Sequence, residues 1–240
     1  MSLSHRAQAR LAELSARFDL TEETVAHGRR LLELWETDEL ASTRVTDAVE
    51  GVDQHLADSW VALDLDVVRR ARRAADLGTG AGIPALPLAV ALPGLQMALV
   101  ESVGRRTVFL ERAIEECGLT ERAEIVAERA EGWPEGIGVH DLVTSRALAT
   151  LDVVLEYSAP LLQLGGVAVA WKGALTDEER AGGFKAAEVL GLEIEAEIVV
   201  EPFAGARDRR LVVARKVAET PERFPRREGM AKKKPLGAAR

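Results

Sequence analysis

The stretch DLGTGAGIPALPLAV, residues 76–90, contains a glycine-rich turn between a short apolar run and a helix pattern. Its glycines, Gly78, Gly80 and Gly82, read G-x-G-x-G, whereas a dinucleotide-binding fingerprint reads G-x-G-x-x-G. Glycines at such a place let the chain turn sharply and bring its backbone against a ligand. Two prolines that follow remove amide donors that a phosphate at a helix N-terminus would need. The loop therefore favours a ligand recognised by its contour over a pyrophosphate.

Short apolar runs alternate with helix patterns on both sides of this turn, which is typical of βαβ units and a mostly parallel sheet. No helix separates the last two runs, so we expect them to pair as an antiparallel hairpin. Apolar residues recur at three- and four-residue spacing over 4–36 and 44–63, which predicts N-terminal helices. The expected strands are 74–78, 96–101, 122–128, 140–147, 166–173, 192–201 and 209–217, and the later helices are 83–92, 104–117, 151–163 and 177–190.

This pattern predicts an α/β fold in three parts. Residues 1–72 form an N-terminal helical segment packed on the core, 73–217 form the cofactor-binding core, and 218–240 form a basic C-terminal tail. The net charge of −8 argues against a nucleic-acid partner, but the tail holds seven Lys and Arg against three Glu. Its prolines predict an irregular path along the body. We expect removal of the tail to leave cofactor binding nearly intact.

The remaining composition is ordinary for a globular protein of one large domain. A single cysteine, Cys117, excludes an internal disulfide and suits a reducing compartment. No run of about 18 apolar residues occurs, and the first residues lack a secretion-signal pattern. We therefore expect a cytoplasmic protein without a membrane partner.

An acidic residue follows the second predicted strand. Glu101 lies 23 residues after Gly78, where a carboxylate can accept both hydroxyl hydrogens of a ribose and would repel a 2′-phosphate. Both NAD and S-adenosylmethionine (SAM) fit this arrangement. The G-x-G-x-G rhythm and the closing hairpin favour SAM, as in class I methyltransferases.

Several motifs beyond this loop point to one family. They are HLADS (55–59), DLGTGAGIPALPLAV (76–90), LVESVGRRTVFLERAIEECGL (99–119), ERAEGWP (128–134), DLVTSRALA (141–149) and TPERFPRREGMAKKKPL (220–236). In this order and spacing they resemble the bacterial small-subunit (16S) ribosomal RNA guanine-N7 methyltransferase family, RsmG, also called glucose-inhibited division protein B. The chain departs from the family pattern at Ala85 (usually Gly), at Glu36 (usually Asn), at STRVTD over 42–47 (usually Asn-Leu-Thr) and at Leu148 (usually Phe).

The resemblance implies a class I SAM-dependent, Rossmann-like fold and methyl transfer from SAM to N7 of a guanine in 16S rRNA. It places SAM against Gly78, Ile83, Ala130, Glu131 and Arg146, and Ala130 and Glu131 follow the third strand, where an amide and a carboxylate can read adenine. The full expected cofactor set is Gly78, Gly80, Gly82, Ile83, Glu101, Ala130, Glu131 and Arg146.

The chemistry of guanine N7 needs few protein groups. N7 carries an in-plane lone pair and no proton, so no general base is required. The four histidines are scattered and form no nucleophile or metal pattern, so we expect no metal. Catalysis then rests on positioning, which supplies about 7–11 kcal/mol of a barrier. Arg146 is the expected positioning residue, either through guanine O6 or through the SAM carboxylate.

RNA binding requires positive charge near the cleft, and loops at strand ends converge on one edge of the sheet. The resemblance implies 16S rRNA as the substrate, free or within the 30S subunit, and we expect a monomer. Other classes remain open: a methyltransferase for a protein or small molecule, an NAD-dependent oxidoreductase, or a non-catalytic ribosome-assembly factor. The candidate RNA contacts are Arg105, Arg129, Lys172, Arg209, Arg226, Arg227, Lys232, Lys233 and Lys234.

Overall fold

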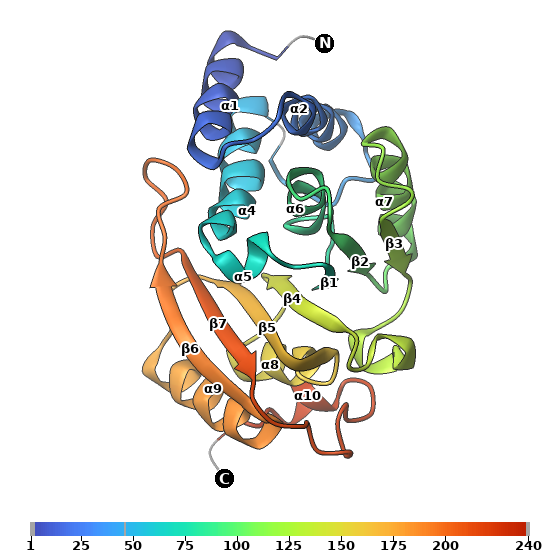
Figure 1. The fold of residues 1–240 in the computed structure, drawn as a ribbon, viewed down its shortest axis with the longest axis vertical. Helices are drawn as coiled ribbons and strands as arrows, with labels where there is room; N and C mark the ends of the chain where they lie inside the picture. Colours follow the sequence, from blue (N-terminus) through green and yellow to red (C-terminus); the bar gives the residue numbers. More distant parts are fainter. Residues whose placement is uncertain (1–2, 46, 239–240) are drawn as a thin grey trace.

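A seven-stranded sheet forms the centre of the molecule in the computed structural model, which describes residues 3–45 and 47–238 (Figure 1). The strand order is β3-β2-β1-β4-β5-β7-β6. The first five strands pair in parallel, whereas β7 is antiparallel to both of its neighbours. The strands are β1 (Arg73–Leu77), β2 (Gln96–Val100), β3 (Ala123–Val126), β4 (His140–Arg146), β5 (Leu162–Lys172), β6 (Leu192–Val199) and β7 (Arg210–Lys216).

The predicted mostly parallel sheet and its antiparallel closing pair are confirmed. The strand bounds differ most from the prediction at β3, which is shorter than 122–128, and at β5, which begins four residues before 166. The hairpin pattern alone did not show that β7 inserts between β5 and β6, because that placement depends on partners far away in the sequence.

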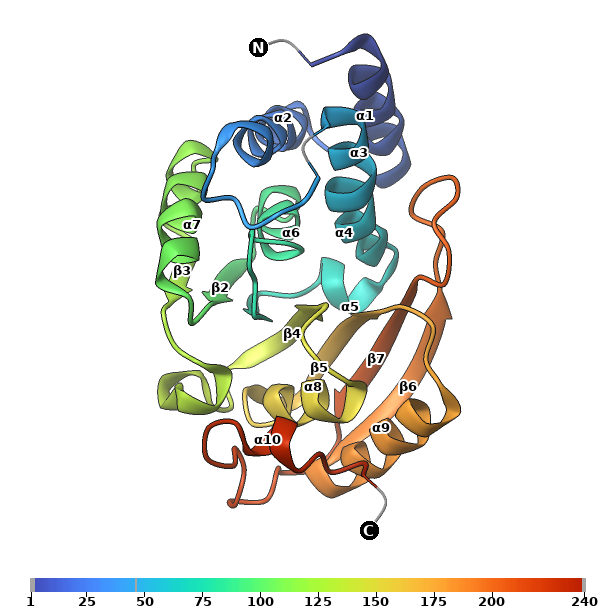
Figure 2. The same cartoon turned by 180° about the vertical axis from the view of Figure 1, so that it is seen from behind.

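Helices cover both faces of the sheet. The N-terminal helices, α6 and α7 pack on one face, and α8, α9 and the tail with α10 pack on the other (Figures 1 and 2). Ser4, Thr21 and Thr176 cap α1, α2 and α9 by accepting backbone amides. The helices are α1 (His5–Phe18), α2 (Glu22–Thr37), α3 (Ala48–Gly51), α4 (Asp58–Trp60), α5 (Asp66–Arg69), α6 (Ala85–Ala91), α7 (Gly104–Glu116), α8 (Leu151–Ser158), α9 (Asp177–Leu190) and α10 (Met230–Lys233).

The predicted single helix over 44–63 is wrong in detail. A π-helical turn over Val52–Ala57 separates α3 from α4, and a 3₁₀ turn follows over Val61–Asp64. The apolar spacing predicted helical structure correctly, but spacing cannot reveal the extra residue of a π turn, which often occurs at functional sites. This turn and α4 carry the HLADS motif, including His55 and Asp58.

Tryptophans fasten the N-terminal helices to the sheet layer. The indole N–H of Trp35 donates to the Ala81 carbonyl at 2.9 Å, and that of Trp60 donates to the Pro87 carbonyl at 2.8 Å. Both carbonyls lie in the glycine loop or the helix after it, so the N-terminal helices hold this loop directly. Among the described residues, no helix is long and apolar enough to cross a bilayer.

The C-terminal tail lies against α8 and α9 in an irregular path interrupted only by α10 (Figure 2). Phe224 and Ala231 are buried in the core on this face. Gly237 crosses Gly182 of α9 so closely that a Cβ on Gly237 would collide with the Gly182 backbone. The Gly237 amide also donates to an Asp152 carboxylate oxygen at 3.0 Å. The tail is thus fastened to the body.

Candidate active site

The crevice where ligands bind in such sheets lies at the carboxyl ends of β1 and β4. The chain passes from β1 outward to β3 and then returns to place β4 on the other side of β1, so strand order reverses between these two strands. The glycine loop follows β1 and Arg146 ends β4. The sequence therefore places its two main predicted elements at the same switch point.

The three loop glycines all have left-handed backbone angles, with φ of 65°, 59° and 78° at Gly78, Gly80 and Gly82. Added Cβ atoms at Gly78 and Gly82 would strike Leu148 and Leu86. A Cβ at Gly80 would meet nothing closer than the Gly78 carbonyl oxygen at 3.8 Å. Gly80 is therefore the position where the backbone faces open space, as a loop that admits a ligand requires.

Glu101 lies at the end of β2 and is only 4% exposed. One carboxylate oxygen accepts from the Gly80 amide at 3.1 Å and from the Arg106 guanidinium at 3.1 Å. The other oxygen accepts from the Val103 amide at 2.9 Å. The side chain holds the glycine loop and the β2–α7 turn together, and a carboxylate with about four acceptor positions keeps one free.

A cleft of about 340 Å³ opens beside these residues, within the size range of small-molecule sites. Its walls combine apolar side chains, which suit an adenine ring, with the carboxylates of Glu101, Glu128 and Glu131. Gly80, Gly82 and Ile83 lie in the loop that continues from Gly78. The walls include Gly78, Glu101, Val103, Ala130, Glu131 and Leu148.

Two buried polar atoms near the glycine loop have no partner among the described residues. They are one carboxylate oxygen of Asp76 and the hydroxyl of Thr79. The other Asp76 oxygen accepts from the Thr144 hydroxyl at 2.7 Å. Burial raises the pKa of Asp76 to about 7. Buried polar groups are normally satisfied, so these atoms suit a site that holds a polar ligand when it works. The sequence reading did not single out Asp76, although it stands in the quoted loop.

The C-terminal tail contributes to the wall of the same cleft. Lys232 lies on the cleft wall, and the Gly229 amide donates to a Glu131 carboxylate oxygen at 3.0 Å. Arg226 holds this segment in place through two hydrogen bonds to the buried carboxylate of Glu156. Removal of the tail is therefore expected to disturb this cleft, in contrast to the sequence-based expectation that cofactor binding would stay nearly intact.

A second, smaller pocket of about 180 Å³ adjoins the cleft and contains Arg146. Its guanidinium pairs with Asp58 at 2.8 Å and donates to the Gln54 carbonyl at 2.8 Å. Ala147 lines both spaces and has a φ of 53°, a strained angle for a residue with a side chain. Arg146 was expected among the cofactor contacts, and the structure places it in the pocket beyond Ala147.

Comparison with known proteins identifies the family. Residues 21–209 match the GidB model, described as rRNA small subunit methyltransferase G. The chain belongs to this family. It is 38% identical to the ribosomal RNA small subunit methyltransferase G of Carboxydothermus hydrogenoformans over 81% of this chain and 83% of that protein. It is likewise 38% identical to the protein of the same name from Desulfitobacterium hafniense, over 91% and 90% of the two chains.

Solved structures support the fold of this methyltransferase. The mitomycin 7-O-methyltransferase MmcR aligns over 88% of this chain and 67% of its own, with a TM-score of 0.57 and 20% identity. The fibrillarin pre-rRNA processing protein of Methanococcus jannaschii aligns over 65% and 70%, with a TM-score of 0.52 and 16% identity. These likenesses confirm the class I methyltransferase architecture. The methyl donor follows from the family: as a small-subunit rRNA methyltransferase, the protein uses SAM. The open Gly80 backbone, the buried acceptors and the partly apolar cleft fit that cofactor.

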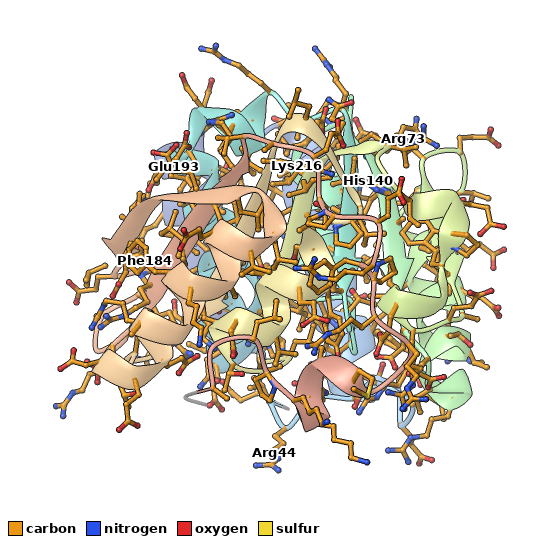
Figure 3. The ribbon with its side chains drawn as sticks, turned by 90° about the horizontal axis from the view of Figure 1, so that it is seen from below. Arg44, Arg73, His140, Phe184, Glu193 and Lys216 are labelled. Carbon is orange, nitrogen blue, oxygen red and sulfur yellow. The ribbon has the colours of Figure 1, made fainter. Side chains whose placement is uncertain are left out.

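The predicted RNA contacts of the methyltransferase divide into paired and unpaired cations. Arg129 pairs with Glu228, Lys172 with Glu179, Arg209 with Asp58 and Arg226 with Glu156. The others are exposed and make no ion pair within residues 3–45 and 47–238; they are Arg105, Arg227, Lys232, Lys233 and Lys234. Figure 3 adds Arg44, which the sequence reading did not consider; it projects from the same side as α10, opposite Arg73.

The buried His55 is held by contacts within the protein. His55 meets the edge of the Trp35 ring at a centroid distance of 4.9 Å, and its Nε2 lies 2.8 Å from the Thr43 hydroxyl. Burial, followed by the charge of Arg146, lowers its pKa to about 4, so the ring is neutral at pH 7. In the described part of the chain, no group of three or more His, Cys, Asp or Glu side chains is placed to hold a metal ion.

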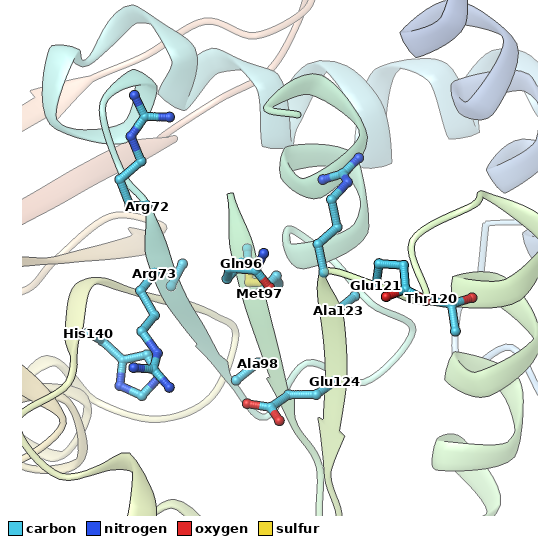
Figure 4. Close-up of a pocket in the computed structure, with 12 residues that line it drawn as sticks. Arg72, Arg73, Gln96, Met97, Ala98, Thr120, Glu121, Ala123, Glu124 and His140 are labelled. Carbon is cyan, nitrogen blue, oxygen red and sulfur yellow. The ribbon is translucent and has the colours of Figure 1, made fainter. Parts of the chain in front are cut away.

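A separate hollow of about 580 Å³ lies at the amino ends of β1, β2 and β3 (Figure 4). It contains Arg72 and Arg73 of the basic run 69–73. His140, at the border of the hollow, has a structural role, because its Nδ1 lies 3.1 Å from the Gly136 carbonyl and 3.2 Å from the Leu161 carbonyl. The hollow is at the edge of the sheet opposite the crevice, so it is not the site of methyl transfer.

Proposed function

We propose that this methyltransferase transfers the methyl group of SAM to N7 of a guanine in 16S rRNA. The observation that carries the proposal is the junction at Ala147, where a cleft suited to a nucleoside cofactor meets a smaller pocket lined by Asp58 and Arg146. A methyl group delivered at this junction would reach a base held in the smaller pocket. The pocket is smaller than a typical drug-sized site of about 300 Å³, which suits a single flipped base.

The ribose of the cofactor is proposed to bind Glu101, with adenine near Ala130 and Glu131. A ribose diol needs two acceptor positions, and Glu101 has one free while Arg106 uses another. Ribose binding therefore replaces the hydrogen bond from Arg106. SAM supplies an electrophilic methyl group when bound. The protein holds that group and N7 in line, and no residue needs to remove a proton.

The unpaired cations are proposed to bind the RNA backbone beside the cleft. Arg227, Lys232, Lys233 and Lys234 lie on the tail segment that reaches the cofactor site, and Arg105 begins α7. Each phosphate contact to a single strand changes the slope of log affinity against log salt by about 0.7. Arg226 holds Glu156 and is not expected to reach RNA.

The three-part organisation, 1–72, 73–217 and 218–240, remains our proposal for the division of labour. Helices of the first part hold the glycine loop and supply Asp58, the second part binds the cofactor, and the third closes the cleft and meets RNA. We propose that the protein works as a monomer, because both pockets are built within one chain. We also propose that it works in the cytoplasm, as suits an enzyme that modifies ribosomal RNA.

The test is methyl transfer from labelled SAM to 16S rRNA, presented as free RNA, as a partial particle and as the 30S subunit. Nucleoside mass spectrometry of the product identifies the modified base, and chain cleavage specific for 7-methylguanosine locates it. We expect 7-methylguanosine from at least one of the three substrates. Methylation of another atom, or no transfer to any of the three, would refute the proposal.

A further inference from the structure

Two of the family motifs, HLADS and DLVTSRALA, meet in the smaller pocket through Asp58 and Arg146. We propose that Asp58 and Arg146 together select guanine: Asp58 accepts the N1–H of the base while Arg146 donates to O6. This inference rests on the proposed function, because it requires a guanine in the smaller pocket. It adds Asp58, from the N-terminal helices, to the residues that touch the substrate.

The carboxylate of Asp58 has an unused acceptor inside the pocket. Asp58 is 1% exposed, and one oxygen pairs with Arg146 at 2.8 Å. Its other oxygen has no hydrogen-bond partner among the described residues, although it forms a longer ion pair with Arg209, whose Nε lies 3.6 Å away. A buried acceptor without a hydrogen-bond donor destabilises the protein, so a ligand that donates to this oxygen gains binding free energy.

The surrounding chain holds this carboxylate rigidly. The Trp171 indole N–H donates to the Asp58 carbonyl at 2.6 Å, which joins α4 to the end of β5. The Gln54 carbonyl, in the π turn just before α4, accepts from Arg146. Asp58 and Arg146 are therefore fixed side by side, and the donor and the acceptor face a ligand as one unit.

The Asp58 acceptor beside the Arg146 donor is complementary to guanine and not to adenine. Along the Watson–Crick edge, guanine presents the O6 acceptor next to the N1–H donor, whereas adenine presents the N6 amino donor next to the N1 acceptor. Enzymes that flip a base commonly read it on this edge. Adenine would set its acceptor against the Asp58 carboxylate and its amino group against the Arg146 guanidinium, and both contacts would be repulsive.

The same pairing orients N7. On guanine, O6 lies between N1 and N7, so a base with O6 on Arg146 and N1–H on Asp58 turns N7 to the far side of Arg146. Ala147 follows Arg146 directly and lines both the pocket and the cofactor cleft. The pair thus selects the base and presents its N7 toward the junction where the methyl group arrives.

The experiment compares three RNA substrates that carry guanine, inosine or 2-aminopurine at the target position. Inosine keeps O6 and N1–H, and 2-aminopurine lacks both while it keeps N7. For the wild type we expect kcat/KM with inosine within a few-fold of guanine, and kcat/KM with 2-aminopurine lower by roughly tenfold or more. Equal rates for guanine and 2-aminopurine would overturn the inference without any variant.

Variants then assign the role to Asp58. Asp58→Asn should reduce the preference for guanine over 2-aminopurine by roughly tenfold. Asp53→Asn, which removes a carboxylate of the same π turn that pairs with Arg10 at 2.8 Å, should leave the preference unchanged. If Asp58→Asn lowers both rates by one factor, Asp58 contributes nothing at the Watson–Crick edge of the base and the inference is wrong. A wild type that methylates no guanine N7 refutes the proposed function instead.

Discussion

Replacing Arg226 by alanine tests whether the tail is part of the folded site. Arg226 makes two hydrogen bonds to the carboxylate of Glu156, which is 1% exposed, and a third to the Lys234 carbonyl at 2.9 Å. Removing one partner of a buried ion pair costs about 3–5 kcal/mol, because the other charge stays buried. The Arg226 side chain is 21% exposed, so water can reach the vacated space. We therefore expect a loss of about 3 kcal/mol in the free energy of unfolding.

Urea unfolding measures this loss, with Arg227→Ala as the matched control. Arg227 is the neighbouring exposed arginine and has no ion pair among the described residues, so its removal should cost at most about 0.5 kcal/mol. The double variant with Glu156→Gln should recover part of the loss, because no buried charge is then left alone.

Calorimetry of SAM binding gives a second measurement on the same variants. The tail segment that Arg226 holds also supplies the Gly229 amide to Glu131 and places Lys232 at the cleft. Arg226→Ala should therefore weaken SAM binding, and Arg227→Ala should not. Equal stability and equal SAM affinity in the two variants would refute the view that the tail completes the cofactor site.

Three further perturbations test the cleft and the buried histidine. Gly80→Val should weaken SAM binding by roughly tenfold or more. Gly205 also has a left-handed backbone angle but lies in an open loop, so Gly205→Val should bind SAM normally. Normal SAM binding by Gly80→Val would mean that the glycine loop is an ordinary turn. Glu101→Gln should lose about 1.5–3 kcal/mol of SAM binding free energy by calorimetry, and an unchanged affinity would exclude the ribose assignment. The pKa of His55 falls from an unfolded value of about 6.5 to about 4 in the fold, so the unfolded chain takes up the proton first and the wild type loses stability as the pH falls from 6.5 to 4. His55→Gln should remove about 3 kcal/mol of that loss, and parallel unfolding curves for the two proteins from pH 7 to 4 would contradict this.

The parts of the site that the sequence predicted are those set by local spacing. Gly78 and Glu101 follow consecutive strands of a parallel sheet, and the fold rule alone brings such strand ends together. Arg146 was predicted from the family resemblance, and its place at the end of β4 agrees with the same rule. Its partner Asp58 was not predicted, because 88 residues separate the two and a π turn, which apolar spacing cannot show, sets the direction of the Asp58 side chain.

The charged residues of the tail show the same limit of prediction from sequence. Its lysines and arginines indicated a nucleic-acid contact, and composition could not tell which of them would meet a carboxylate of the body. Arg226 meets Glu156 across 70 residues, a contact that only the folded chain creates. The prolines predicted an irregular path correctly, but not that Phe224 would be buried beside α8 and α9.

With the ribose on Glu101 as proposed, the hydrogen bond between Arg106 and Glu101 would couple the binding of the two substrates. Without cofactor, Arg106 is neutralised at the mouth of the cleft. With a ribose on Glu101, the guanidinium is released beside Arg105, and the surface that meets the phosphates gains one positive charge. Cofactor-loaded protein should then hold RNA more tightly than the free protein, and by thermodynamic reciprocity RNA should tighten the hold on the cofactor by the same factor. When the spent cofactor leaves, Arg106 returns to Glu101, the surface loses that charge, and release of the methylated RNA becomes easier.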